Sequence, residues 1–104
     1  MSESPLHQIN DLIHAKVRLG IMSLLMTHKQ CDFAFLKKRL ETTDGNLSSH
    51  IQKLEQANYI SVEKEFVGRK PKTSIKVTNL GSDAYKEYIT TLESILKVTL
   101  ESKG

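Results

Sequence analysis

The hydrophobic and polar positions of the chain follow helical spacing over most of the first 58 residues. Between residue 6 and about residue 26, apolar side chains recur mostly at three- and four-residue steps, which predicts a long helix. Asp32 is suited to cap a second helix that ends near residue 40. Residues 42–45 favour a turn and a helix cap, so we expect a third helix from there to about residue 58.

The spacing changes at residue 60. Apolar and polar residues alternate over residues 60–66 and again over 74–78, and the segment between them contains Gly68 and Pro71. Alternation on both sides of a Gly/Pro turn predicts an antiparallel hairpin. Helical spacing returns from residue 79 to about residue 102. Three N-terminal helices, a hairpin and a long C-terminal helix predict a mainly α (α+β) winged helix-turn-helix with a two-stranded β-hairpin wing.

The third predicted helix has two chemically different sides. At 100° per residue its apolar side consists of Leu47, Ile51 and Leu54, and no acidic residue lies between Gly45 and Leu54. The remaining side is small, polar and basic, which fits the major groove of DNA, where such side chains bond bases and phosphates. The alternative is the solvated side of an ordinary surface helix. The candidate contacts are Thr43, Asn46, Ser48, Ser49, His50 and Lys53.

The predicted turn between the two strands is basic. Gly68 supplies backbone freedom, and positions 68–76 contain four cations and no acid. Cations at a hairpin tip can bind backbone phosphates or, for arginine, a narrow minor groove. A solvated tip is the alternative, since such tips commonly carry lysine. The candidate wing contacts are Arg69, Lys70, Lys72 and Thr73.

The last predicted helix is longer than a small domain can cover. About 24 residues at roughly 1.5 Å each make a rod of about 36 Å. Its apolar side therefore needs a partner, and a second copy of the chain would give a two-fold homodimer. The alternative is that this helix folds back over the first one. The candidate dimer contacts are Tyr85, Tyr88, Ile89, Leu92, Ile95, Leu96 and Thr99.

Composition limits the chain to one small domain. It has 104 residues, a net charge of +3 and a pI near 9.0, which suits a polyanionic partner. The single cysteine, Cys31, excludes an intramolecular disulfide and fits a reducing cytosol. No apolar run is long enough to span a bilayer, and the first residues lack the features of a secretion signal. We therefore expect a cytoplasmic protein without a membrane partner.

Patterns of catalysis and metal binding are missing from the sequence. It has no paired carboxylates, nucleophile elbow or Gly-rich phosphate loop. His7 and His14 lie two helical turns apart, whereas His28 and His50 are isolated, so no close pair indicates zinc. We expect no enzyme activity, no metal and no cofactor, and the effector, if any, is unknown. A metal- or ligand-responsive sensor with a site near His7 and His14 remains an alternative.

Two segments of the chain resemble a known family. Residues 43–54 (TDGNLSSHIQKL) are similar to the recognition-helix segment of small winged helix transcriptional regulators related to the MarR and ArsR types. Residues 66–73 (FVGRKPKT), with Val77 and Thr78 after them, are similar to the wing of these proteins. The resemblance extends from Val17 to Tyr88 and concerns the compact single-domain members.

This resemblance implies a prokaryotic homodimer that binds promoter or operator DNA and regulates transcription. The residues implied at the DNA are Asn46, Ser48, Ser49, His50 and Lys53 in the major groove and Arg69, Lys70 and Lys72 on the wing. The chain lacks the paired cysteines of metal-sensing relatives, and Asn58 stands where glycine is common.

The domain organisation expected from these patterns has three parts. Residues 1–5 are a disordered lead, residues 6–78 a winged helix DNA-binding core, and residues 79–104 a dimerisation helix. Winged helix domains also bind partner proteins, and the apolar last helix could serve that purpose. A protein-interaction module is therefore the second alternative to a DNA-binding regulator.

Overall fold

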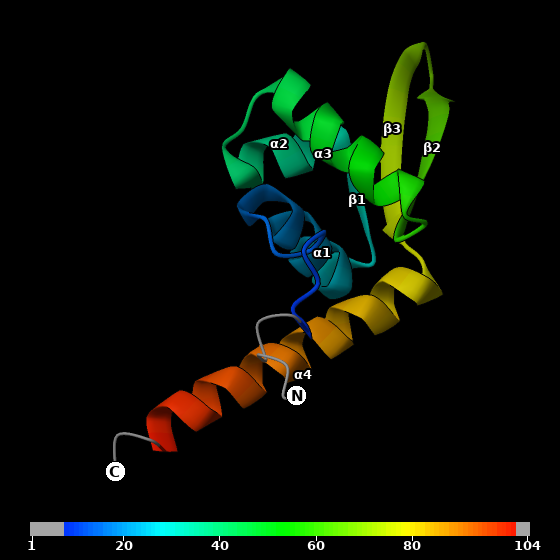
Figure 1. Cartoon of the computed structure of the whole chain (residues 1–104). Helices are drawn as coiled ribbons and strands as arrows, with labels where there is room; N and C mark the ends of the chain where they lie inside the picture. Colours follow the sequence, from blue (N-terminus) through cyan, green and yellow to red (C-terminus); the bar gives the residue numbers. More distant parts are fainter. Residues whose placement is uncertain (1–7, 102–104) are drawn as a thin grey trace.

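The computed structural model describes residues 8–101 (Figure 1). Its elements are α1 (Lys16–His28), β1 (Gln30–Asp32), α2 (Phe33–Leu40), α3 (Asp44–Gln56), β2 (Ile60–Val67), β3 (Lys70–Val77) and α4 (Asn79–Glu101). This order confirms the predicted winged helix-turn-helix. The predicted disordered lead, residues 1–5, lies outside the described residues.

The first three helices and the sheet enclose one apolar core. Helix α3 contributes Leu47, Ile51 and Leu54, the three residues predicted for its apolar side. The fully buried side chains from the rest of the domain are Ile13, Ile21, Met22, Leu25, Leu36 and Ile75. Because α3 is anchored along its whole apolar side, its polar side is directed outward.

The first helix begins at Lys16, whereas the apolar spacing predicted a start near residue 6. Before it, the side-chain oxygen of Asn10 accepts hydrogen bonds from the backbone N–H groups of Leu12 (3.0 Å) and Ile13 (3.1 Å), which closes a turn. Ile13 is fully buried. The turn directs apolar side chains into the core at the same intervals as a helix would. The predicted helix over residues 6–26 is therefore wrong for residues 8–15.

The sheet has one strand more than the predicted hairpin. Strand β1 pairs antiparallel with β3, with Cys31 opposite Ile75, and the strand order is β1-β3-β2. Asp32 ends β1 and caps α2, because its carboxylate accepts a hydrogen bond from the N–H of Phe35 (2.7 Å). The predicted cap is confirmed, and the added strand connects α1 and α2 to the hairpin.

The hairpin is longer and its turn tighter than the alternation suggested. Residues 60–67 pair with residues 70–77 along their whole length, which leaves only Gly68 and Arg69 in the turn. Gly68 has φ of 68°, a left-handed conformation that glycine adopts without strain. The hairpin therefore projects as a two-stranded ribbon with its cations at and next to the tip.

Helix α3 ends in a left-handed turn. Asn58 has φ of 62°, and its N–H donates to the carbonyl of Glu55 (2.9 Å) while that of Tyr59 donates to Leu54 (3.0 Å). Asparagine tolerates this conformation better than most residues. The requirement for a left-handed residue explains why asparagine can stand where glycine is common.

Helix α4 runs along one side of the domain and continues beyond it (Figure 1). It has 23 residues, and the structure measures 60 × 24 × 22 Å. Its first half packs on the domain, whereas its second half projects away. None of the helices in residues 8–101 has the length and apolar character needed to cross a membrane.

Candidate nucleic-acid interface

The start of α3 is organised by hydroxyl side chains. Thr43 Oγ1 accepts a hydrogen bond from the N–H of Asn46 (3.1 Å), and Asn46 Nδ2 donates to Thr42 Oγ1 (2.8 Å). Asp44 in the first turn pairs with Lys37 at 2.8 Å on the exposed surface. Asn46 is exposed, as the sequence suggested, but one of its N–H groups is already bonded within the protein.

The outward side of α3 is polar and free of acids through most of its length. Ser48, Ser49 and Lys53 are all exposed, and Gln52 lies between them. Gln52 is not among the predicted contacts, but it is exposed and belongs to the same surface. Figure 1 shows α3 on the side of the domain away from α4, with the hairpin beside it.

His50 differs from its neighbours on α3. It is half-buried, and its Nδ1 accepts a hydrogen bond from the Arg18 guanidinium at 2.9 Å. The same Arg18 side chain donates to the backbone carbonyl of Leu12. Burial first, and then the charges of Arg18 and Lys53, lower the pKa of His50 below its usual value near 6.5. The structure thus places His50 between α3 and α1, and its predicted contact with DNA stays a prediction.

Stability should depend on pH through His50. Its pKa is lower in the folded chain than in the unfolded chain, so the unfolded chain binds the proton more readily. The contribution of neutral His50 to the free energy of unfolding is complete above about pH 6.5, and it is lost as the pH falls towards the folded-state pKa. We expect His50→Gln, which keeps an acceptor for Arg18, to lose less stability than wild type between about pH 7.5 and 5.5 in urea unfolding.

Gln52→Ala, at an exposed position of the same helix, is the matched control, because it removes no titratable group. This variant should keep the wild-type pH dependence of stability. If the free energy of unfolding changed with pH in the same way for wild type and the His50 variant, the lowered pKa of His50 would be contradicted.

The hairpin tip presents the predicted cations to solvent. Arg69, Lys70 and Lys72 are exposed, and Thr73 is half-buried. Lys72 lies opposite Glu65 in the strand register, so an acid and a cation share this face of the hairpin. Thr73 lies on the other face of β3, towards α3.

The hairpin and α3 border one groove. A hollow of about 470 Å³ lies between them. The residues that line it are Phe33, Ser48, Ile51, Gln52, Glu55, Val62, Lys64 and Thr73. Lys64 was not among the predicted contacts, although its two-residue spacing from Val62 could have placed it on this face. The groove joins the polar side of α3 to the hairpin, and Glu55 is the acid among its lining residues.

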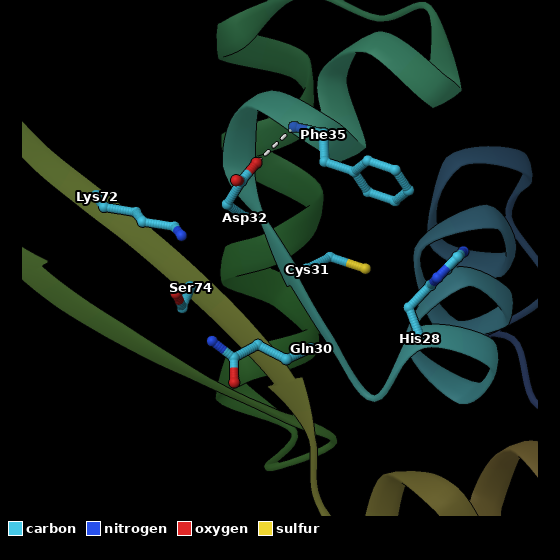
Figure 2. Close-up of a pocket in the computed structure, with 7 residues that line it drawn as sticks. All are labelled: His28, Gln30, Cys31, Asp32, Phe35, Lys72 and Ser74. Atoms are coloured by element: carbon cyan, nitrogen blue, oxygen red, sulfur yellow. Dashed lines mark hydrogen bonds between the residues drawn. The ribbon is translucent and has the colours of Figure 1, made fainter. Parts of the chain in front are cut away.

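A second hollow, of about 310 Å³, lies on the other face of β3. Figure 2 shows the residues that line it: His28, Gln30, Cys31, Asp32, Phe35, Lys72 and Ser74. The Asp32 carboxylate is used as the cap of α2, and burial, followed by the charge of Asp32, raises the pKa of the Cys31 thiol. Residues 8–101 contain no group of three His, Cys, Asp or Glu side chains that could hold a metal ion. His7 lies outside the described residues, and His14 contacts Tyr88.

The predicted dimer contacts on α4 fall into two groups. Tyr85 and Tyr88 hydrogen bond within the chain, to Ser23 (2.9 Å) and to His14 Nδ1 (2.8 Å). Ile89 and Leu92 also pack on the core of the same chain. The residues nearer the C-terminal end are half-buried Ile95, exposed Leu96 and exposed Thr99. The first half of α4 is thus covered by its own domain, as the alternative prediction had it, while the second half is exposed.

The chain is similar to known winged helix proteins over most of its length. The family described as winged helix DNA-binding domain matches residues 17–96. The Methanocaldococcus jannaschii protein MJ0432 is 40% identical over 78 residues, which are 75% of this chain and 85% of that protein.

Solved structures of transcriptional regulators have the same fold. The transcriptional regulator homologue of Pyrococcus horikoshii has a TM-score of 0.85 at 29% identity, covering 91% of this chain and 96% of that one. Bordetella bronchiseptica BpsR, whose DNA binding is regulated by 6-hydroxynicotinic acid, has a TM-score of 0.70 at 17% identity, covering 89% and 70%. At that identity the likeness concerns the fold alone. The structural neighbours are regulators of the MarR and ArsR types, which confirms the resemblance.

Proposed function

The chain belongs to the winged helix DNA-binding domain family, and we propose that it is a sequence-specific, double-stranded DNA-binding transcriptional regulator that acts as a homodimer. One observation carries this proposal. The polar outward side of α3 and the hairpin border the same groove, on the side of the domain away from α4, and Glu55 is the acid that lines it. A single duplex can therefore contact both elements.

The two elements have different roles in this proposal. An α-helix fits the major groove, where Ser48, Ser49 and Asn46 would bond base edges and thereby select the sequence. Lys53 would bind a phosphate or a guanine. The hairpin cations would bind the flanking backbone, which adds affinity for every sequence.

The homodimer is supported by the exposed end of α4. Leu96 is 54% exposed and Leu100 is 71% exposed, on a helix that extends past its own domain. Contiguous exposed apolar side chains commonly mark an interface. A two-fold pairing of this end would present two copies of α3 to two half-sites on one duplex.

The experiment that tests the function is selection of bound duplexes from a random pool. We expect enrichment of a palindromic sequence whose half-sites lie about one helical turn apart. Equal retention of random and selected duplexes would contradict sequence-specific binding. An enriched site without symmetry would contradict the homodimer and leave the DNA-binding function standing.

The dimer makes a separate prediction. Leu96→Glu combined with Leu100→Glu should convert a dimer into a folded monomer, because both side chains are exposed in the single chain and charges are costly in an apolar interface. Sedimentation equilibrium would measure the mass and circular dichroism the folding.

Leu80→Glu is the matched control on the same helix, since Leu80 is 55% exposed at the other end. This variant should remain dimeric. A wild-type monomer at micromolar concentration would contradict the proposal. Salt-insensitive binding of another protein through this end of α4 would then favour the protein-interaction module.

A further inference from the structure

The most exposed large apolar side chain in residues 8–101 lies at the hairpin tip. Phe66 is 75% exposed, and the adjacent Val67 is 60% exposed. Isolated apolar residues are ordinary on protein surfaces, so exposure alone identifies no partner. The strand register and the surrounding charges restrict what can cover Phe66.

The register places Phe66 on the face of the hairpin that borders the groove. Phe66 pairs with Pro71, and paired residues share a face while successive residues alternate. Both therefore lie on the same face as Lys64, which lines the groove beside α3. Val67, one residue later, lies on the opposite face. This apolar pair thus lies on the same face as the groove residues Lys64 and Thr73, one alternation nearer to the hairpin tip.

The charges around this pair favour a polyanion. Lys64 lies on the same face as Phe66 and Arg69 lies in the turn beside it, whereas Lys70 and Lys72 lie on the other face with Val67; residues 66–73 contain no acid. A partner that covers Phe66 must therefore present negative charge and apolar surface side by side. Duplex DNA has this combination, because its phosphates flank deoxyribose sugars, and apolar side chains enter minor grooves in many complexes.

We propose that Phe66, together with Pro71, packs against deoxyribose sugars at the edge of the minor groove, beside a phosphate bound by Arg69. This inference rests on the proposed function and adds an apolar contact to the electrostatic one. The contact supplies affinity that does not depend on salt, because covering a ring releases no counterions from the phosphates.

Salt titration distinguishes this contact from the charged ones. Binding would be measured by fluorescence anisotropy over a range of salt, with a duplex recovered in the random-pool selection and a scrambled duplex of equal length. We expect Phe66→Ala to bind about tenfold more weakly at every salt concentration, with an unchanged slope of log K against log salt. Phe66→Leu should stay within about threefold of wild type.

Val67→Ala is the matched control, because Val67 is exposed at the same tip on the other face. It should stay within about twofold of wild type. Both positions are exposed, so thermal unfolding should match wild type for both variants. Wild-type affinity in Phe66→Ala would overturn the inference, as would an equal loss in Val67→Ala or a changed salt slope.

Two further outcomes are decisive. If wild type binds no duplex, both the proposed function and this inference fail, whereas duplex binding unaffected by Phe66→Ala removes the inference alone. Vesicles of phosphatidylserine and phosphatidylcholine test an anionic membrane as the partner. Retention on vesicles that Phe66→Ala abolishes, without loss of DNA affinity, would overturn the inference in favour of a lipid surface.

Discussion

Replacing Arg69, Lys70 and Lys72 together with Gln is expected to weaken binding to every duplex by about a hundredfold at low salt. All three side chains are exposed at the hairpin, so their replacement should leave the folded structure unchanged. Each lost phosphate contact should lower the slope of log K against log salt by about one. Fluorescence anisotropy over a salt series, on selected and scrambled duplexes, measures both quantities.

The control for this variant has the same net charge. Lys16, Lys29 and Lys86 are exposed on α1, directly after α1 and on α4, so none of them lies on α3 or the hairpin. Changing these three to Gln also removes three positive charges, so it reproduces any effect of net charge at long range. The control should keep the wild-type slope. Equal slopes for the wing variant and wild type would show that the hairpin does not contact the duplex.

The wing variant should also keep its preference among sequences. Phosphate contacts contribute affinity without distinguishing bases, so selected and scrambled duplexes should lose affinity by similar factors. A loss confined to the selected duplex would instead mean that Arg69 contacts bases or a narrow minor groove. Comparing the two duplexes therefore distinguishes a wing that binds only the phosphate backbone from a wing that contacts bases.

Elements with long, regular patterns were predictable from the sequence. Helix α3 has apolar residues at three- and four-residue steps, and the hairpin strands alternate over residues 60–66 and 74–78; tertiary packing did not alter either pattern. The cap at Asp32 was predictable because an N-cap acts within three residues of itself. Local interactions of this kind are visible in the sequence alone.

Short elements were not predictable in the same way. Strand β1 has three residues, fewer than a period-two pattern needs, and exists because β3 has a free edge beside it. The turn closed by Asn10 has a helix-like sequence pattern, because Ile9, Leu12 and Ile13 all pack on the core at helical intervals. The partner of β1 is distant in the sequence, and the turn closed by Asn10 has the same apolar spacing as a helix. In neither place is the local sequence pattern enough to predict the structure.

In the candidate site, too, local features were predictable from the sequence and long-range contacts were not. The exposure of Ser48, Ser49 and Lys53 follows from helical periodicity. The attachment of His50 to Arg18 does not, because 32 residues separate the two side chains. Predicting it would have required the packing of α1 against α3.

Gly81 is the position where a single methyl group should cost most. It is buried in the first turn of α4, where a Cβ would overlap the backbone oxygen of Tyr59 and lie 2.8 Å from its carbonyl carbon. The side-chain oxygen of Thr78 accepts a hydrogen bond from the N–H of Gly81 (3.0 Å) and donates to the carbonyl of Asn58 (2.6 Å). The Tyr59 oxygen also accepts from the N–H of Thr78 (3.0 Å). Neither side of this close contact can move without breaking one of these bonds.

We therefore expect Gly81→Ala to lower the free energy of unfolding by about 3 kcal/mol, and the midpoint of thermal unfolding by more than about 10 °C. Gly45→Ala is the matched control, because nothing lies within 4 Å of a Cβ there. In a helix that change should stabilise by about 0.5 kcal/mol. Urea unfolding measures both, and equal stability of the two variants would contradict the close approach. Because this approach fixes the start of α4 against the residue before β2, a folded Gly81 variant should also lose more affinity, relative to wild type, for palindromic duplexes than for single half-sites.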